Sequence, residues 1–97
     1  MSDSATSSPP ARQTCLIGNR LGLHARAAAK FLKLAGTFDA EVWVELNGTR
    51  VSGVSILGLM MLAAGPGTEL TLESTGTNAV DALNALAQLI ENKFDED

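Results

Sequence analysis

Hydrophobic and polar positions recur along the chain with periods that predict strands and helices in turn. Strict alternation over Glu41–Leu46 and Glu69–Glu73 places apolar side chains on one face, as a half-buried strand requires. The short apolar run Thr14–Ile17 predicts an earlier strand. Thr49–Ser52 predicts a further strand, because it follows Asn47-Gly48, a dipeptide favoured in tight hairpin turns.

Three segments have the patterns of helices. Ala25–Ala35 carries an apolar stripe at helical spacing, and so does the stretch from Asn78 onward. Ile56–Ala63 is apolar on nearly every side, follows Ser55 as a helix cap and stops before Gly65-Pro66-Gly67. The acidic end Phe94–Asp97 is expected to fray.

The predicted order is therefore β-α-β-β-α-β-α, with no repeat and no internal linker. Alternating strands bury one face, so the pattern favours an α+β fold in which helices cover one side of an antiparallel sheet. The other side would meet water, and Trp43 would lie on it or at its edge. A chain of 97 residues supports one domain. We assign that domain to residues 14–94 and expect residues 1–13 to form a disordered N-terminal tail.

Composition excludes several classes of protein. Apolar residues make up 45% of the chain and charged residues 19%, which is ordinary for a soluble globular protein. No segment reads as a secretory signal or a membrane span, so we expect a cytoplasmic protein. One cysteine, Cys15, and one histidine, His24, do not supply the ligands of a zinc site. We therefore expect no metal and no cofactor, and we expect Cys15 to be a buried hydrophobe.

Charge is distributed unevenly around the single histidine. The net charge is −4, yet residues 4–38 contain no acid. They hold five basic residues: Arg12, Arg20, Arg26, Lys30 and Lys33. His24 thus lies in the only basic part of an acidic protein, and Arg26, Lys30 and Lys33 share one side of the predicted helix. Such a stripe would steer an anionic group or an acidic partner towards the ring.

His24 falls at the start of a helix, where backbone N–H groups lack intrahelical partners and the dipole favours anions. Neutral imidazole is also a nucleophile at physiological pH. A phosphoryl group transferred to it would find support from Arg26, whose planar fork suits phosphate oxygens. This chemistry requires a solvent-accessible ring beside free amides and Arg26. We expect no carboxylate to face the ring, because one there would rule this chemistry out.

Other interpretations stay open on the residues alone. His24 can be a capping or surface histidine, and the basic stripe can be an ordinary solvated helix face. The protein can also be a small α+β binding module, although Trp43 is the only aromatic placed for RNA and is flanked by acids. A third alternative is a regulator that binds proteins in one phosphorylation state without onward transfer.

Three stretches resemble the HPr family, the histidine phosphocarriers of the bacterial phosphotransferase system. "NRLGLHARAAAKF" resembles the family's active-site segment. "GTRVSGVSILGLMMLAAGPGTELTLESTG" is similar to the region that spans its hairpin, regulatory serine and last strand, and "NAVDALNALAQLI" to its C-terminal helix. The resemblance implies an open-faced sandwich of four antiparallel strands covered on one side by three helices.

The resemblance also implies roles for particular residues. His24 would accept a phosphoryl group on Nδ1 from enzyme I and pass it to an EIIA-type protein, and Arg26 would stabilise the phosphohistidine. Ser55 would be the target of HPr kinase in species that possess that enzyme. Residues expected at the partner-binding face are Arg20, Ala27, Lys30, Leu57, Met60 and Met61. The protein would be a monomeric carrier and not an enzyme, with no nucleic-acid or membrane partner.

Two positions depart from the family pattern. Ala27 stands where members that serve sugar uptake usually have proline, and Val54 stands where a lysine usually precedes the regulatory serine. The first change is similar to the nitrogen-related branch, whose carrier feeds a regulatory EIIA. The second weakens the expectation that HPr kinase recognises Ser55.

Overall fold

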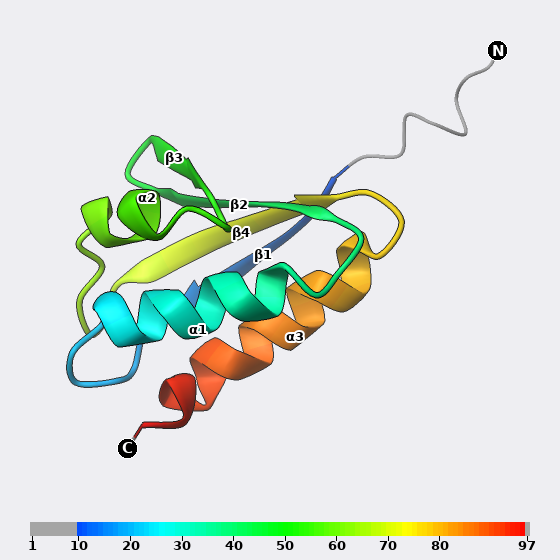
Figure 1. Cartoon of the computed structure of the whole chain (residues 1–97). Helices are drawn as coiled ribbons and strands as arrows, with labels where there is room; N and C mark the ends of the chain where they lie inside the picture. Colours follow the sequence, from blue (N-terminus) through cyan, green and yellow to red (C-terminus); the bar gives the residue numbers. More distant parts are fainter. Residues whose placement is uncertain (1–9, 97) are drawn as a thin grey trace, which may run out of the picture.

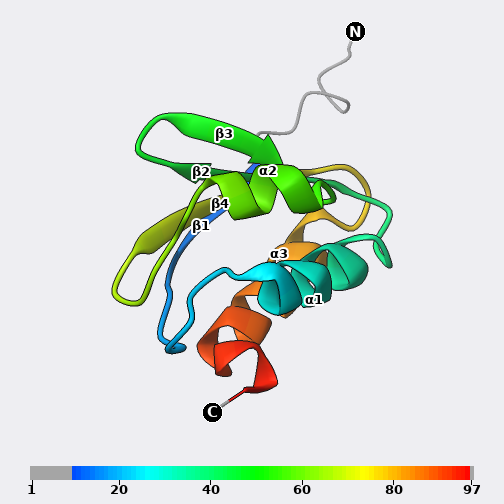
Figure 2. The same ribbon diagram turned by 60° about the vertical axis from the view of Figure 1, so that its left-hand side comes forward.

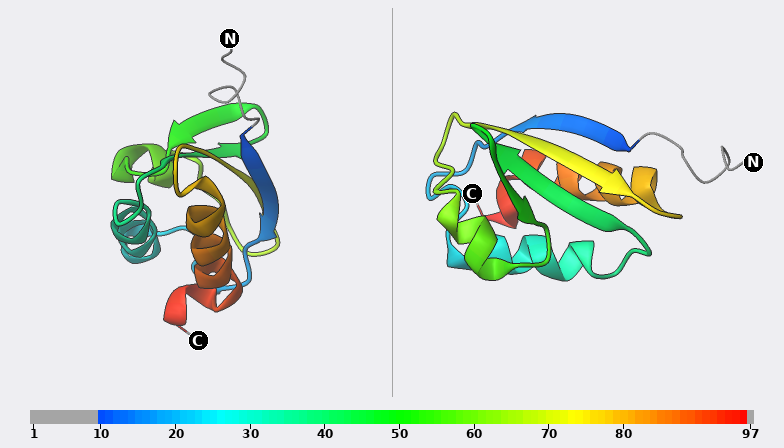
Figure 3. Two further views of the ribbon diagram at one scale, coloured as in Figure 1. Left: turned by 90° about the vertical axis from the view of Figure 1, so that its right-hand side faces the viewer. Right: turned by 90° about the horizontal axis from the view of Figure 1, so that it is seen from above.

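The structure, a computed structural model, describes residues 10–96 and consists of an antiparallel sheet with helices on one face (Figure 1). The elements in chain order are β1 (Ala11–Leu16), α1 (Ala25–Ala35), β2 (Glu41–Leu46), β3 (Thr49–Ser52), α2 (Ile56–Met61), β4 (Glu69–Thr75) and α3 (Ala79–Glu91). A short turn, Lys93–Asp95, follows α3. Figure 3 shows the two layers from the side. The predicted fold class is confirmed.

The four strands lie in the order β1-β4-β2-β3, and every neighbouring pair is antiparallel. β4 is therefore central, pairing Leu72 with Gln13 of β1 on one side and with Val44 of β2 on the other. The Asn47-Gly48 turn joins β2 to β3, as its sequence predicts, with both residues at positive φ. The chain thus brings its first and fourth strands together across the whole domain.

β1 is longer than the hydrophobic pattern predicts. It begins at Ala11, so the last three residues of the predicted tail, Ala11–Gln13, belong to the sheet. Arg12 and Gln13 are exposed and are held by pairing with β4, whereas Ala11 pairs with β4 and also packs against the edge of the core. The remainder of the predicted tail, residues 1–9, lies outside the described residues.

The core lies between the sheet and the helices. Buried strand residues include Cys15, Val42, Val44, Leu70 and Leu72, which face Phe31 of α1, Leu59 of α2, and Leu83, Leu86 and Ile90 of α3. The thiol of Cys15 is buried as predicted, and this burial raises its pKa. α1 and α3 lie side by side, and α2 lies beside α1 near β3 (Figure 2).

The opposite face of the sheet is polar, which agrees with the predicted exposure of that side. Trp43 is half-buried there, and the guanidinium of Arg50 lies 5.0 Å from the centre of its ring. The Glu73 carboxylate accepts hydrogen bonds from Arg50 and Arg12, and the bond from Arg50 lowers its pKa. The Arg50 guanidinium thus covers part of the half-buried aromatic ring.

Candidate functional site

His24 is the N-cap of α1, as the sequence predicts. Its backbone is extended, with φ −79° and ψ 179°, and its carbonyl accepts the first helical bond from Ala28 at 2.8 Å. The His24 side chain caps no amide of the helix. Within residues 10–96 the amides of residues 25–27 have no hydrogen-bond acceptor either. The start of α1 therefore presents free N–H donors and the positive end of the helix dipole beside the imidazole.

The loop before α1 fixes the position of His24. Gly22 adopts a φ of +63°, which favours glycine, and the next amide, Leu23 N–H, donates to the Ala64 carbonyl at 2.8 Å. Asn19 is fully buried, and its Nδ2 donates to the Gly22 carbonyl at 2.8 Å. The site is therefore anchored both to the loop after α2 and to a buried amide side chain.

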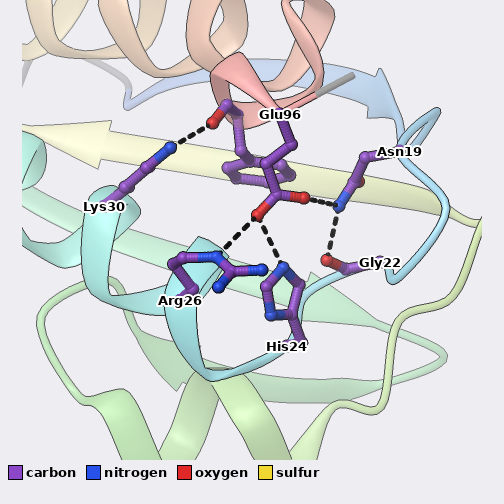
Figure 4. A network of polar contacts seen from close by, with 7 residues as sticks. Asn19, Gly22, His24, Arg26, Lys30 and Glu96 are labelled. Atoms are coloured by element: carbon purple, nitrogen blue, oxygen red, sulfur yellow. Dashed lines mark hydrogen bonds and ion pairs between the residues drawn. The ribbon is translucent and has the colours of Figure 1, made fainter.

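A carboxylate faces the imidazole, and the expectation that none would do so is wrong. Oε2 of Glu96 lies 2.7 Å from Nε2 of His24 (Figure 4). Sequence proximity could not reveal this acid, because it is 72 positions away. The His24 side chain remains 21% exposed, so the ring is at the surface and not in the hydrophobic interior.

Glu96 has partners on both of its carboxylate oxygens. Oε2 also lies 3.6 Å from Nε of Arg26, and Oε1 accepts a hydrogen bond from Nδ2 of Asn19 at 3.2 Å. Desolvation raises the pKa of Glu96, but the hydrogen bonds from His24 and Asn19 and the charges of His24 and Arg26 outweigh it. The pKa lies below the usual value as a result. Glu96 is therefore held as an ionised group between the two residues predicted to carry the chemistry.

The turn Lys93–Asp95 brings Glu96 to His24, and the prediction that this end frays is wrong for the described residues. Lys93, Phe94 and Asp95 all adopt positive φ, at 56°, 55° and 61°. Phe94 is fully buried, and its carbonyl accepts a 2.7 Å hydrogen bond from Nζ of Lys30. Phe94 was the sequence signal for an ordered end, because an aromatic side chain within an acidic segment is stabilised by packing against the core.

The basic residues occupy different environments. Arg26 projects outward with 67% of its side chain exposed, and Arg20 and Lys33 are exposed too. Lys30 is half-buried and committed to the Phe94 carbonyl, so it stabilises the C-terminal turn rather than standing free. The three cations of the predicted stripe therefore differ: Arg26 lies beside Glu96, Lys30 binds the Phe94 carbonyl, and Lys33 is exposed.

Apolar side chains are exposed close to α1 on α2, as the sequence predicts. Leu57 and Met61 are 73% and 77% exposed, and Met60 is 42% exposed. Ala27 is fully buried in the core, so its prediction as a partner-binding residue is wrong: helical spacing turns it towards the sheet. Leu59 and Leu62 form the buried side of this segment, whereas Ile56, Met60 and Ala63 are exposed.

Ser55 is the N-cap of α2, and its Oγ accepts a 3.0 Å hydrogen bond from the amide of Gly58. The capping interpretation is thus confirmed, and the serine is half-buried at the edge of the exposed apolar residues.

Residues 10–96 contain no group of three or more side chains that would hold a metal ion. Of the helices in this range, none is long and apolar enough to cross a membrane.

Comparison with known proteins agrees with the geometry. Residues 11–92 match the family model described as the PTS HPr component phosphorylation site. Phosphocarrier protein HPr of Neisseria meningitidis is 51% identical over 85 residues, which cover 88% of this chain and 96% of that protein. Phosphocarrier protein NPr of Shewanella violacea is 48% identical over 80 residues, which cover 82% of this chain and 88% of that protein.

Solved structures show the same fold. The crystal structure of HPr from Thermoanaerobacter tengcongensis superposes with a TM-score of 0.86 at 39% identity, covering 90% of this chain and 98% of the other. Relatives called HPr and NPr match at nearly equal identity, so the assignment to the nitrogen-related branch stays a prediction. The match of sequence and of fold over most of the chain shows that it belongs to the HPr family of phosphoryl carriers of the phosphotransferase system.

Proposed function

We propose that His24 is the residue that carries the phosphoryl group, accepting it from enzyme I and passing it to an EIIA-type protein. The observation that carries this proposal is the position of the only imidazole of the chain at the N-cap of α1. There it lies at the surface, beside unpaired amides and Arg26. Proteins of the family work with enzyme I and EIIA partners in general, whereas the particular partners of this chain are part of the proposal.

The surroundings of His24 suit the charge that transfer creates. A phosphorylated side chain carries about −1.5 to −2 charges at neutral pH. The free amides at the start of α1 and the dipole of the helix favour an anion at this place. Arg26 is exposed and able to turn its guanidinium onto phosphate oxygens. The site therefore stabilises a phosphohistidine without burying it. A carrier requires this, because it must pass the phosphoryl group on to an acceptor.

The proposed partner surface joins the start of α1 to α2. Leu57, Met60 and Met61 supply an apolar centre, and Arg20 and Arg26 supply positive charge at its edge. Methionine side chains adapt to partners of different shape, which suits a carrier that must dock first on a donor and then on an acceptor. We omit Ala27 from this surface because it is buried, and Lys30 acts through its contact with Phe94.

Ser55 is proposed as a regulatory site in organisms that possess HPr kinase. Its hydroxyl already caps α2, so a phosphate there would sit next to the exposed side chains of Leu57 and Val54. A new dianion at this place would disfavour an apolar or acidic partner surface. The absence of a lysine at position 54 makes recognition by the kinase the step to be tested.

The remaining parts of the proposal concern the protein as a whole. We propose a cytoplasmic, monomeric carrier built from a single domain. It needs no cofactor of its own and turns over no small molecule alone. Enzyme I and EIIA contribute the rest of each transfer site.

The test is incubation with phosphoenolpyruvate and enzyme I, followed by intact-protein mass spectrometry. We expect a mass gain of one phosphoryl group that is labile in acid, stable in base and absent from His24→Ala. Lys33→Ala serves as a control that removes an exposed charge of α1 outside the proposed partner surface and leaves the imidazole. No gain in the unmodified protein would refute the carrier proposal and favour a binding module.

Transfer from the phosphorylated protein to EIIA proteins then separates a carrier from a regulator that does not pass the group on. Sugar-specific and nitrogen-branch EIIA proteins of the same organism are compared as acceptors. Loss of the label to one of them identifies the branch. Retention of the label with both would refute onward transfer.

A further inference from the structure

We propose that Glu96 is a positioning residue for phosphoryl transfer, because it holds the His24 ring in the tautomer whose Nδ1 is the nucleophile. This inference rests on the proposed function of His24. Its starting point is the 2.7 Å contact between Glu96 Oε2 and His24 Nε2. An ionised carboxylate only accepts hydrogen bonds, so the proton of the neutral ring must be on Nε2.

The other ring nitrogen is then free. With the proton on Nε2, Nδ1 keeps its lone pair, and within residues 10–96 no hydrogen bond involves it. The nucleophilic atom is therefore the one not in contact with Glu96, and the carboxylate does not block attack. An acid at this ring is compatible with phosphorylation for that reason, although the sequence alone led us to expect the opposite.

The carboxylate also supports the charge that develops during transfer. The Nδ1 lone pair forms a bond to phosphorus, while the bond from phosphorus to the donor breaks and its electron pair stays on the donor. The ring then carries substituents on both nitrogens and becomes cationic. Glu96 faces this cation through Nε2–H, as the buried aspartate faces the imidazolium in serine proteases. Neither an oxidant nor a further reactant is needed.

The C-terminal turn is built to keep Glu96 in this place. Lys93, Phe94 and Asp95 all adopt the left-handed backbone conformation, although none of them is glycine. Residues with a β-carbon keep this conformation only where surrounding contacts stabilise it. The burial of Phe94 and the hydrogen bond from Lys30 hold the turn, and Asn19 fixes the second oxygen of Glu96. The carboxylate itself has three contacts, with Asn19, His24 and Arg26 (Figure 4).

The tautomer can be measured without any partner protein. His24 is the only histidine, so selective ¹⁵N labelling of histidine gives the two ring nitrogens of one residue. At a pH where the ring is neutral, we expect Nε2 to be the protonated nitrogen in the unmodified protein. Glu96→Ala should give a mixture of tautomers. Glu96→Gln should restore the Nε2–H form, because the amide oxygen accepts the same hydrogen bond, and the control Glu91→Ala should match the unmodified protein.

The rate of phosphoryl uptake from enzyme I then tests the consequence. Hydrogen bonds to charged groups contribute enough that Glu96→Ala should slow uptake about tenfold to a hundredfold at saturating donor. Glu91→Ala, which removes an exposed acid with no contact to the ring, should leave the rate unchanged. The inference would be overturned if Glu96→Ala kept the Nε2–H tautomer, or if Glu96→Gln failed to restore it. Uptake by Glu96→Ala that is as fast as in the unmodified protein, or faster, would overturn it too. Failure of the proposed function is distinct, since the unmodified protein would then take up no phosphoryl group at all.

Discussion

Replacement of Gly22 by alanine should disturb the loop that places His24 and destabilise the domain. The φ of +63° at Gly22 is a conformation that alanine adopts only with strain. A β-carbon built there would also overlap the carbonyl oxygen of Ala64 and lie 2.8 Å from the Cα of Gly65. Because the Ala64 carbonyl accepts the bond from Leu23 N–H, the loop cannot relieve the overlap without breaking that bond.

The size of the effect follows from these two contributions. Left-handed backbone costs a residue with a β-carbon about 1–2 kcal/mol. A buried amide that loses its acceptor costs about 1–3 kcal/mol, and Leu23 is buried. We therefore expect Gly22→Ala to lower the free energy of unfolding by about 2–5 kcal/mol. Gly67→Ala is the matched control: its φ is +85°, but a β-carbon there meets nothing within 4 Å, so only the first contribution applies.

The assay is urea unfolding followed by the fluorescence of Trp43, the only tryptophan of the chain. It lies on the far face of the sheet and does not report on the loop itself, so a shift of the midpoint measures global stability. For a domain of this size each 1 kcal/mol corresponds to about 4–8 °C in Tm, which gives a second readout. Equal destabilisation by Gly22→Ala and Gly67→Ala would refute the role assigned to the contact with Ala64.

Three further predictions concern the partner surface, the carboxylate and the C-terminal turn. Leu57→Asp, at a side chain that is 73% exposed, should weaken the binding of enzyme I about tenfold or more, as measured by calorimetry. Leu16→Asp, at an exposed side chain of β1, should leave the affinity unchanged. Equal affinities of the two variants for enzyme I would contradict the docking surface. The pKa of Glu96 is lowered in the folded protein, so its contribution to stability is present above the ordinary value of 4.5 and is lost as the pH falls through the lower folded pKa. The difference in unfolding free energy between the unmodified protein and Glu96→Ala should therefore shrink in acid; a difference that grows instead would exclude this linkage. Phe94→Ala should release the turn and speed the modification of His24 by diethyl pyrocarbonate, measured by mass spectrometry, and an unchanged rate would show that burial of Phe94 does not hold the turn.

The fold was predictable because each element carries its own periodicity. Alternation in Glu41–Leu46 and the stripe in Ala25–Ala35 are local signals, and both elements begin and end in the structure at the predicted residues. The edge strand β1 was predicted too short, since its first residues are held by pairing with β4 and have no apolar pattern of their own. Ala27 was misplaced for a different reason: family position suggested a surface role, while the helix turns this residue into the core.

Only the part of the site at the start of α1 was predictable from the sequence. His24 and Arg26 are neighbours in sequence, so the start of α1 and its charge were apparent from the residues alone. Glu96 comes from the other end of the chain and reaches the ring through a left-handed turn of residues other than glycine, which no propensity favours. The tertiary contacts of Phe94 and Lys30 help to hold that turn, and such contacts leave little trace in a single sequence.

The closeness of the C-terminal turn to the imidazole has a practical consequence for recombinant work. A bulky group attached shortly after Glu96 would lie close to the imidazole and would crowd the ring and its docking partners. β1 starts at the end of the sheet remote from the loop that leads to His24 (Figure 1). Fusions are therefore better attached at the amino terminus, and kinetic comparisons between laboratories should record which end was extended.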